Sequence, residues 1–180
     1  PALVIGLISL QNSRAALEQQ IFDQLEAQRT IKANQITQHF ASAEHDIQTL
    51  ADNLALMIEK QGLEQAISQV DQNGQTLFSR YIERNDYYDL FLLDTEGYCF
   101  YSVTEEADYQ TNLISGKFKD SGLGEVVQKA LFDSQYHMSD LAPYAPSNGD
   151  PAAFIAAPVM VQNELVMILA MQLSLDGIDA

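Results

Sequence analysis

The sequence predicts an α+β protein, in which a long N-terminal helix is followed by a module with an antiparallel sheet of about five strands flanked by helices. Two observations predict this architecture. Residues 13–59 contain no proline and no glycine, and they are rich in Ala, Gln, Glu and Leu, which favour helices. From Tyr87 onward, short apolar runs alternate with turn residues, as is typical of strands. We therefore expect two regions, a stalk helix over residues 1–60 and a sheet-containing module over residues 61–180.

The second half of the long helix carries an apolar seam. Its residues follow a 4-3-4-3-4-3 spacing: Ile36, Phe40, Ala43, Ile47, Leu50, Leu54 and Met57. Such a seam is typical of helices that pair with one another. A helix of about 45 residues is also about 68 Å long, which exceeds the diameter of a globule of this size. We therefore expect the helix to project, to pair with a second copy of the chain, or both.

The first ten residues, PALVIGLISL, are almost entirely apolar. A membrane-spanning helix needs about 20 such residues, so this run is too short to cross a bilayer by itself. It matches the outer end of a transmembrane helix, with a short buried helical turn as the alternative. We expect the former, and because the chain begins at Pro1 we expect it to be a segment of a longer membrane protein.

Turn residues and apolar spacing predict the elements that follow the long helix. Gly62 is the expected end of that helix, and two shorter amphipathic helices are expected at 63–70 and from Leu77 to Tyr81, separated by a turn at 71–74.

The strands are expected in two groups. The first is a hairpin of residues 89–94 and 97–103, joined by the turn Asp94-Thr95-Glu96-Gly97. A loop over 104–124 and a helix over 125–132 come next, and 136–144 is a possible strand. Residues 152–161 and 165–173 form the second group, and their near-continuous apolarity predicts central strands covered on both faces.

Charge and cysteine content exclude some classes of protein. The net charge is −16, from 25 acidic and 9 basic residues. Nucleic acids and anionic lipids bind clustered Lys and Arg, so neither is an expected partner. Cys99 is the only cysteine, which excludes an intrachain disulfide, and its apolar surroundings predict a buried, inert thiol.

No catalytic motif is present. The sequence has no Gly-rich phosphate loop, no HExxH and no CxxC. The acidic group Glu105, Glu106 and Asp108 could bind calcium, but its spacing does not match an EF-hand loop, and we expect a solvated acidic loop. We therefore expect neither an enzyme nor a bound metal or other cofactor.

Ten aromatic residues lie in and around the expected strands: Tyr87, Tyr88, Phe91, Tyr98, Phe100, Tyr101, Tyr109, Tyr136, Tyr144 and Phe154. Tyrosines combine an apolar ring with a hydroxyl, which suits the lining of a small-molecule pocket. We expect most of the ten to pack in the core and three or four to contact a ligand.

Several strings resemble one family of sensor domains. These are DLFLLDTEGYCFYSV, TNL, SGLGEVV and SDLAPYAPSNGDPAAFIAAPV. They resemble the periplasmic Cache (PAS-like) domains of bacterial methyl-accepting chemotaxis proteins and related transmembrane sensors, which share a hairpin with Asp94 and Gly97, a tyrosine at Tyr101 and a proline at Pro158. The resemblance includes the long N-terminal helix. The ending QLSLDGIDA is similar to the end of a first module that continues into another sensor segment.

The resemblance implies a ligand site on the face of the sheet, under a loop. By position, its lining comes from Arg84, Tyr88, Phe91, Tyr101, Asn112, Asp140, Tyr144 and Phe154. Amino-acid-binding members hold the ligand carboxylate with an arginine near an aromatic pair. Arg84 precedes such a pair here, at a different spacing. An anionic ligand would meet Arg84, Lys117 or Lys119, whereas an amine or a neutral ligand would meet Asp140 and tyrosines.

The function implied is that of the extracytoplasmic, periplasmic part of an inner-membrane chemoreceptor. It would bind an amino acid, a carboxylate or an amine, form a homodimer through the long helix, and transmit a conformational signal across the membrane. The alternative is a ligand-free dimerisation or interaction module of a sensor histidine kinase or a cyclase.

Overall fold

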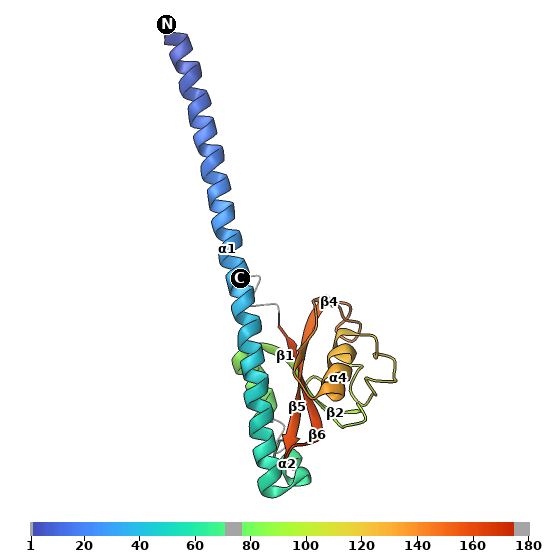
Figure 1. Cartoon of the computed structure of the whole chain (residues 1–180). Coiled ribbons are helices and arrows are strands. Elements are labelled where there is room, and N and C mark those ends of the chain that lie inside the picture. The colour runs from blue at the N-terminus through green and yellow to red at the C-terminus, as the bar shows by residue number, and fades with distance from the viewer. Residues whose placement is uncertain (1, 71–76, 175–180) are drawn as a thin grey trace. The chain divides into compact units, whose positions relative to one another are not determined.

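The computed structural model describes residues 2–70 and 77–174. The chain forms two compact units, residues 1–40 and 41–180. The longest element is helix α1, Ala2–Gln61, which contributes to both units (Figure 1). The turn expected at 71–74 lies outside the described residues.

The first unit consists of α1 up to Phe40, and its described contacts are local. The Gln19 amide donates to Asp23 over 2.9 Å, and the Thr30 hydroxyl donates to the carbonyl of Glu26 over 2.9 Å. Apolar side chains stand exposed along this stretch, among them Leu17 and Phe22. Over residues 2–70 and 77–174, no helix has a stretch both long and apolar enough to span a membrane.

The second unit is built on one antiparallel sheet. Its strands are β1 (Tyr87–Leu93), β2 (Cys99–Ser102), β3 (His137–Met138), β4 (Ala142–Pro143), β5 (Pro151–Val161) and β6 (Glu164–Leu173). The order is β2-β1-β6-β5-β3, and β4 pairs with β5 outside this path. The three central strands β1, β6 and β5 are buried along most of their length. For β5 and β6 this confirms the expectation of central strands covered on both faces.

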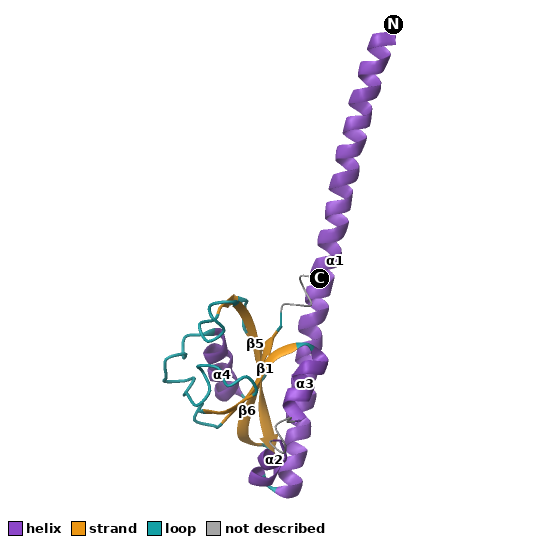
Figure 2. Ribbon diagram, turned by 180° about the vertical axis from the view of Figure 1, so that it is seen from behind, coloured by secondary structure: helices purple, strands orange, loops and turns teal. Residues whose placement is uncertain are grey.

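Helices cover both faces of the sheet. Figure 2 shows α4 (Gly122–Asp133) on one side and α1 with α3 (Leu77–Asn85) on the other. We call the first the α4 face and the second the α1 face, for which the second unit supplies residues 41–61 of α1. Side chains alternate along a strand, so Phe91 belongs to the α4 face and Leu92 to the α1 face. The core on the α4 face also includes Leu123, Val127 and Phe154.

The apolar seam of α1 is largely used within the chain. Ala43, Ile47, Leu50 and Leu54 are buried in the second unit. Tyr87 of β1 reinforces this packing, because its hydroxyl donates to Asp46 of α1 over 2.7 Å. These seam residues therefore stabilise the sheet of their own chain, and pairing of α1 with a second copy stays a prediction.

Turn chemistry explains where the helices begin and end. Gly62 ends α1 as expected, with φ +85° and its amide donating to the carbonyl of Ile58 over 2.8 Å. Helix α2 follows at Leu63–Val70. Helix α4 begins at Gly122, before the expected residue 125, because the Ser121 side chain caps it by accepting from the amide of Gly124 over 3.1 Å.

The possible strand over 136–144 is two short strands, β3 and β4. The chain between them leaves the sheet at Ser139, whose hydroxyl accepts from the amide of Phe154 over 2.9 Å and donates to the carbonyl of Asp140 over 3.0 Å. The side chain thus occupies a position in the ladder that a continuous strand would fill with backbone.

Candidate functional site

A polar cluster lies on the α4 face of the sheet, beside the start of β1 and the end of β6. It contains three neighbouring hydrogen-bonded groups: Asp89 with Ser102 and Thr104, Asp108 with Tyr144, and Glu106 with Ser147 and Gln172. The strand register explains why the strand members meet, because Asp89 is paired with Gln172, which is paired with Phe154. The loop after β2 and the loop after β4 supply the rest. We call this set the polar cluster.

Asp89 anchors the loop after β2. One of its carboxylate oxygens accepts from the backbone amides of Leu90, Val103 and Thr104, at 2.6, 2.9 and 3.2 Å. The other accepts from the hydroxyls of Ser102 and Thr104, at 2.8 and 2.6 Å. Burial raises the pKa of Asp89 to about 6, although the bonds from Thr104 and Ser102 lower it. Every acceptor position of this carboxylate is engaged, so its role is to hold the loop.

Asp108 is the buried carboxylate of the cluster that keeps an open oxygen. The residue is 0% exposed, and its Oδ2 accepts a short hydrogen bond from the Tyr144 hydroxyl. Its Oδ1 has no hydrogen-bond partner among the described residues. Burial raises the pKa of Asp108, while the bond from Tyr144 lowers it. Burial and the neighbouring Asp108 charge raise the pKa of Tyr144. This carboxylate can accept a further donor.

Glu106 and Gln172 extend the cluster toward the sheet. The Glu106 carboxylate accepts from the hydroxyls of Tyr88 and Ser147, at 2.7 and 2.8 Å. The Gln172 amide nitrogen donates to the Ser147 oxygen over 3.2 Å, but its Oε1 has no partner within the described part of the chain. Gln172 is 4% exposed, so it is a second buried acceptor without a donor.

Aromatic rings form the apolar side of the cluster. The rings of Tyr144 and Phe154 lie edge to face with centroids 4.6 Å apart, and Phe91 lies 6.5 Å from Phe154. All three side chains are buried. The cluster therefore combines polar acceptors with an aromatic wall, as small-molecule sites do.

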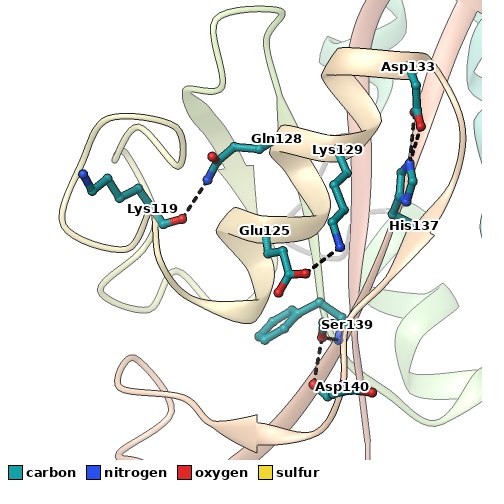
Figure 3. A network of polar contacts seen from close by, with 9 residues as sticks. Lys119, Glu125, Gln128, Lys129, Asp133, His137, Ser139 and Asp140 are labelled. Atoms are coloured by element: carbon teal, nitrogen blue, oxygen red, sulfur yellow. Dashed lines mark hydrogen bonds and ion pairs between the residues drawn. The ribbon is translucent and has the colours of Figure 1, made fainter.

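Among the described residues, no basic side chain forms an ion pair with the cluster. The ion pairs that the structure gives for its described residues are Lys129–Glu125 and His137–Asp133, both on the surface beside α4 (Figure 3). Nor do the described residues hold three His, Cys, Asp or Glu side chains placed to bind a metal ion together. The cluster thus offers acceptors and negative charge without a matching cation.

The structure brings four of the eight expected lining residues together. Phe91, Tyr144 and Phe154 form the aromatic wall, and Tyr88 stands at the rim, 43% exposed, with its hydroxyl on Glu106. Whether they contact a ligand stays a prediction.

The other four lie elsewhere. Tyr101 is on the α1 face, where its ring meets Phe78 of α3 at 5.7 Å, and Arg84 is exposed in the last turn of α3. Asn112 holds its own loop, because its oxygen accepts from the amides of Ile114 and Ser115. Asp140 is exposed, its carbonyl accepts from the Ser139 hydroxyl (Figure 3), and no described hydrogen bond joins it to the polar cluster.

Several members of the polar cluster were not expected from the sequence. The group Glu105, Glu106 and Asp108 was expected to be a solvated loop, whereas Asp108 is fully buried under Tyr144. Asp89 and Gln172 could have been recognised as candidates from the sequence, since each is a polar residue inside an otherwise apolar strand. A buried polar side chain needs a partner, so such positions mark candidate sites.

Comparison with known proteins identifies the class of fold. No family model matches the chain, and no curated protein matches it. Solved structures do match, and among them are sensor and ligand-binding domains of bacterial receptors.

Three of these structures illustrate the likeness. The sensor domain of the V. cholerae histidine kinase DctB has a TM-score of 0.61 and 16% identity, over 89% of this chain and 58% of that one. The ligand-binding domain of the Pseudomonas aeruginosa amino acid chemoreceptor PctC, in complex with GABA, has a TM-score of 0.59 and 16% identity, over 83% and 61%. That of the Campylobacter jejuni chemoreceptor Tlp3, in complex with 4-methylisoleucine, has a TM-score of 0.58 and 8% identity, over 83% and 56%.

The chain spans less than two thirds of the length of these structures. It has the fold that they share, a long N-terminal helix followed by an antiparallel sheet with helices, and this confirms the expected PAS-like, Cache-type architecture.

Proposed function

We propose that the chain is the extracytoplasmic ligand-sensing domain of a bacterial transmembrane receptor of the chemoreceptor type. It binds a small molecule at the polar cluster and passes a conformational change to the membrane through its terminal elements. The receptor is anchored in the inner membrane, and the sensing domain lies in the periplasm and pairs with a second copy through the free surface of the long helix. No catalytic step is part of this function.

One observation carries the proposal. Among the described residues, Asp108 and Gln172 each present a buried oxygen without a donor. Both lie beside the aromatic wall, because Asp108 bonds Tyr144, whose ring packs against Phe154, and Gln172 is the strand partner of Phe154. Leaving such acceptors unpaired costs about 1–3 kcal/mol each. A ligand that donates to them would recover this free energy, and the chain shares its fold with solved ligand-binding domains, which supports the cluster as the binding site.

The position of Gln172 links binding to signalling. It lies next to the last residue of β6, and β6 pairs with both β1 and β5 at the centre of the sheet. A ligand held by Gln172 and by the two loops favours one arrangement of β6 over another. A binding domain signals through such a difference in affinity between two states.

A thermal-shift screen tests the proposal on the full 180-residue chain. Panels of amino acids, carboxylates, amines and sugars are added at increasing concentration. A ligand at 100 times its dissociation constant adds about 2.7 kcal/mol to the free energy of unfolding. For a chain of this size that raises the melting temperature by about 5–10 °C. A screen in which no compound of any panel raises it would refute direct sensing of small molecules.

A second candidate is a ligand-free interaction module of a sensor kinase or a cyclase. Tyr144 favours it, because this side chain is 1% exposed, fills part of the α4 face and already bonds Asp108. In that case the screen gives no shift, yet the chain forms a stable dimer in sedimentation equilibrium. A monomeric chain that responds to a ligand eliminates this candidate.

A further inference from the structure

We propose that a groove between helix α1 and the outer edge of β5 binds a basic amphipathic helix of a partner protein. The groove shares no lining residue with the polar cluster, so it is an interaction surface in addition to the proposed ligand site. Its length, the chemistry of its two walls and its charge each favour this kind of partner.

Two adjoining cavities of about 280 and 330 Å³ form the groove, and Asp52 and Met160 line both of them. Helix α1 supplies one wall, from Gln48 to Glu59. The other wall comes from residues 134–136 and from the last part of β5. At 1.5 Å per residue the helical wall is about 17 Å long, which accommodates a partner helix of about three turns. We call this surface the α1 groove.

The helical wall is suited to packing against a second helix. Gln48, Asp52 and Leu56 are four residues apart, so they form one ridge along α1, and such ridges pack between the side chains of a neighbouring helix. Leu56 is 50% exposed, whereas Leu54 of the same helix is 2% exposed. Leu56 therefore adds little to the core of its own chain and is available as an apolar contact for a partner.

The strand wall disfavours a partner that binds as an added strand. In the described part of the chain, β3 pairs with β5 only at residues 155 and 156, so the edge over 157–161 has no strand partner. Phe154 exchanges its backbone bonds with Ser139 on this edge, and Pro158, four residues later, faces the same way but has no N–H. The register is also irregular between Val159 and Met160. A partner must therefore bind through side chains.

The charge of the groove is acidic. Asp52 and Glu59 are exposed carboxylates two turns apart on its helical wall, and no basic residue lines the two cavities as the structure describes them. A third carboxylate, that of Glu44, lies beside Tyr136 of the other wall, because a hydrogen bond to Glu44 raises the pKa of the Tyr136 hydroxyl. Charges across an interface are complementary in specific complexes, so the partner carries Lys or Arg on either side of its apolar stripe.

A second copy of the chain is a poorer occupant. In a symmetric pair the same patch of both copies meets, which would place Asp52 and Glu59 of one chain against those of the other. Each chain also carries a net charge of −16. Like charges brought together in this way oppose association.

Three labelled peptides of about 15 residues test the groove on the full chain, a length at which an isolated helix begins to form. The first has leucines on one helical face and lysines on either side of them. The second has glutamate in place of each lysine, and the third is a scrambled form of the first. Fluorescence anisotropy is measured at low and at physiological ionic strength, because salt screens attraction that depends on charge alone. We expect the first peptide to bind at both, and the other two at least about tenfold more weakly.

Paired variants locate the binding. Asp52→Asn with Glu59→Gln removes two charges from the groove and should weaken the first peptide about tenfold or more. Glu18→Gln with Glu26→Gln removes the same charge from exposed positions of α1 outside the groove and is the matched control, with little change expected. Leu56→Ala should also weaken binding, whereas Leu17→Ala, which truncates a leucine that is 60% exposed, should not. Circular dichroism checks that each variant is folded.

Weaker binding in the groove variants alone supports the docking of a basic helix. The proposal is overturned if the first peptide does not bind at physiological ionic strength, or if the scrambled peptide binds as tightly. Equal weakening by the control pair overturns it as well, because the attraction would then come from the overall charge. Sedimentation equilibrium tests the remaining occupant: a dimer of the chain that Leu56→Ala dissociates would assign the groove to a second copy.

Discussion

Removing the Asp89 side chain tests whether this carboxylate holds the loop that carries the polar cluster. Asp89→Ala takes the acceptor from two hydroxyls, those of Ser102 and Thr104, and from the backbone amide of Thr104. The backbone amide of Val103 keeps a hydrogen-bond acceptor in this variant, because it also donates to the carbonyl of Leu90 over 3.2 Å. Asp89→Asn keeps one acceptor oxygen and nearly the same shape, which makes it the matched comparison.

The expected magnitude follows from these contacts. An unsatisfied buried donor costs about 1–3 kcal/mol, and Ser102 is buried whereas Thr104 is at the surface. Asp89→Ala also removes the cost of burying a carboxylate, and this offsets part of the stability lost with the hydrogen bonds. We expect Asp89→Ala to lower the free energy of unfolding by about 3 kcal/mol and Asp89→Asn by about 1 kcal/mol. For a domain with a total stability of about 5–15 kcal/mol, the first value is a large fraction.

Urea unfolding followed by far-UV circular dichroism measures both variants against the unchanged chain. The midpoints should fall in the order wild type, Asp89→Asn, Asp89→Ala, with equal slopes, since the surface exposed on unfolding is the same. The reasoning is refuted if Asp89→Ala unfolds within about 1 kcal/mol of the wild type, because each lost partner alone is worth that much.

Three further predictions concern pH, a helix cap and a turn. Burial raises the folded-state pKa of Asp89 from 3.8 to about 6, so between these values the folded state binds more protons than the unfolded state. Stability should therefore rise as the pH falls from 7 to 4, by on the order of 3 kcal/mol, and urea midpoints measured along this range should show a flatter dependence in Asp89→Asn. Ser121→Ala removes the cap of α4 and should cost about 1 kcal/mol in urea unfolding. Exposed Ser115→Ala, at a loop position outside any helix, is the comparison, because it removes a hydroxyl that donates to Asn112 and caps no helix. Gly97→Ala should lower the melting temperature and cost about 1 kcal/mol or more, because Gly97 has φ +79° and a Cβ there would lie 2.4 Å from Cγ1 of Ile114; an unchanged melting temperature would contradict the turn geometry.

Most of the fold could be predicted from the sequence, because its local signals agree with one another. The absence of breakers up to Gly62 predicted α1, and the two apolar runs near the end predicted β5 and β6. The short strands were harder to predict. Strands of two residues such as β3 have no periodicity, so their position depends on contacts such as that of Ser139 with Phe154.

The site was only partly predictable, for two physical reasons. Register decides which face a residue occupies, and the irregularity between Leu92 and Leu93 places Tyr101 on the α1 face, away from Phe91. Burial of a loop depends on distant residues, and nothing near Asp108 in the sequence indicates that Tyr144 covers it. The seam of α1 shows the same effect, because its pattern suits pairing between helices and packing on a sheet equally well.

The single cysteine offers a built-in reporter of motion at the site. Cys99 is 0% exposed in the core of the α4 face, and its neighbours there include Leu113 of the loop after β2. Burial raises the pKa of its thiol to about 12, so in the closed domain neither access nor ionisation permits alkylation. The rate of labelling by a thiol reagent therefore measures how often the core of the α4 face opens. Slower labelling in the presence of a compound would show that the compound stabilises this core against opening, without any engineered probe.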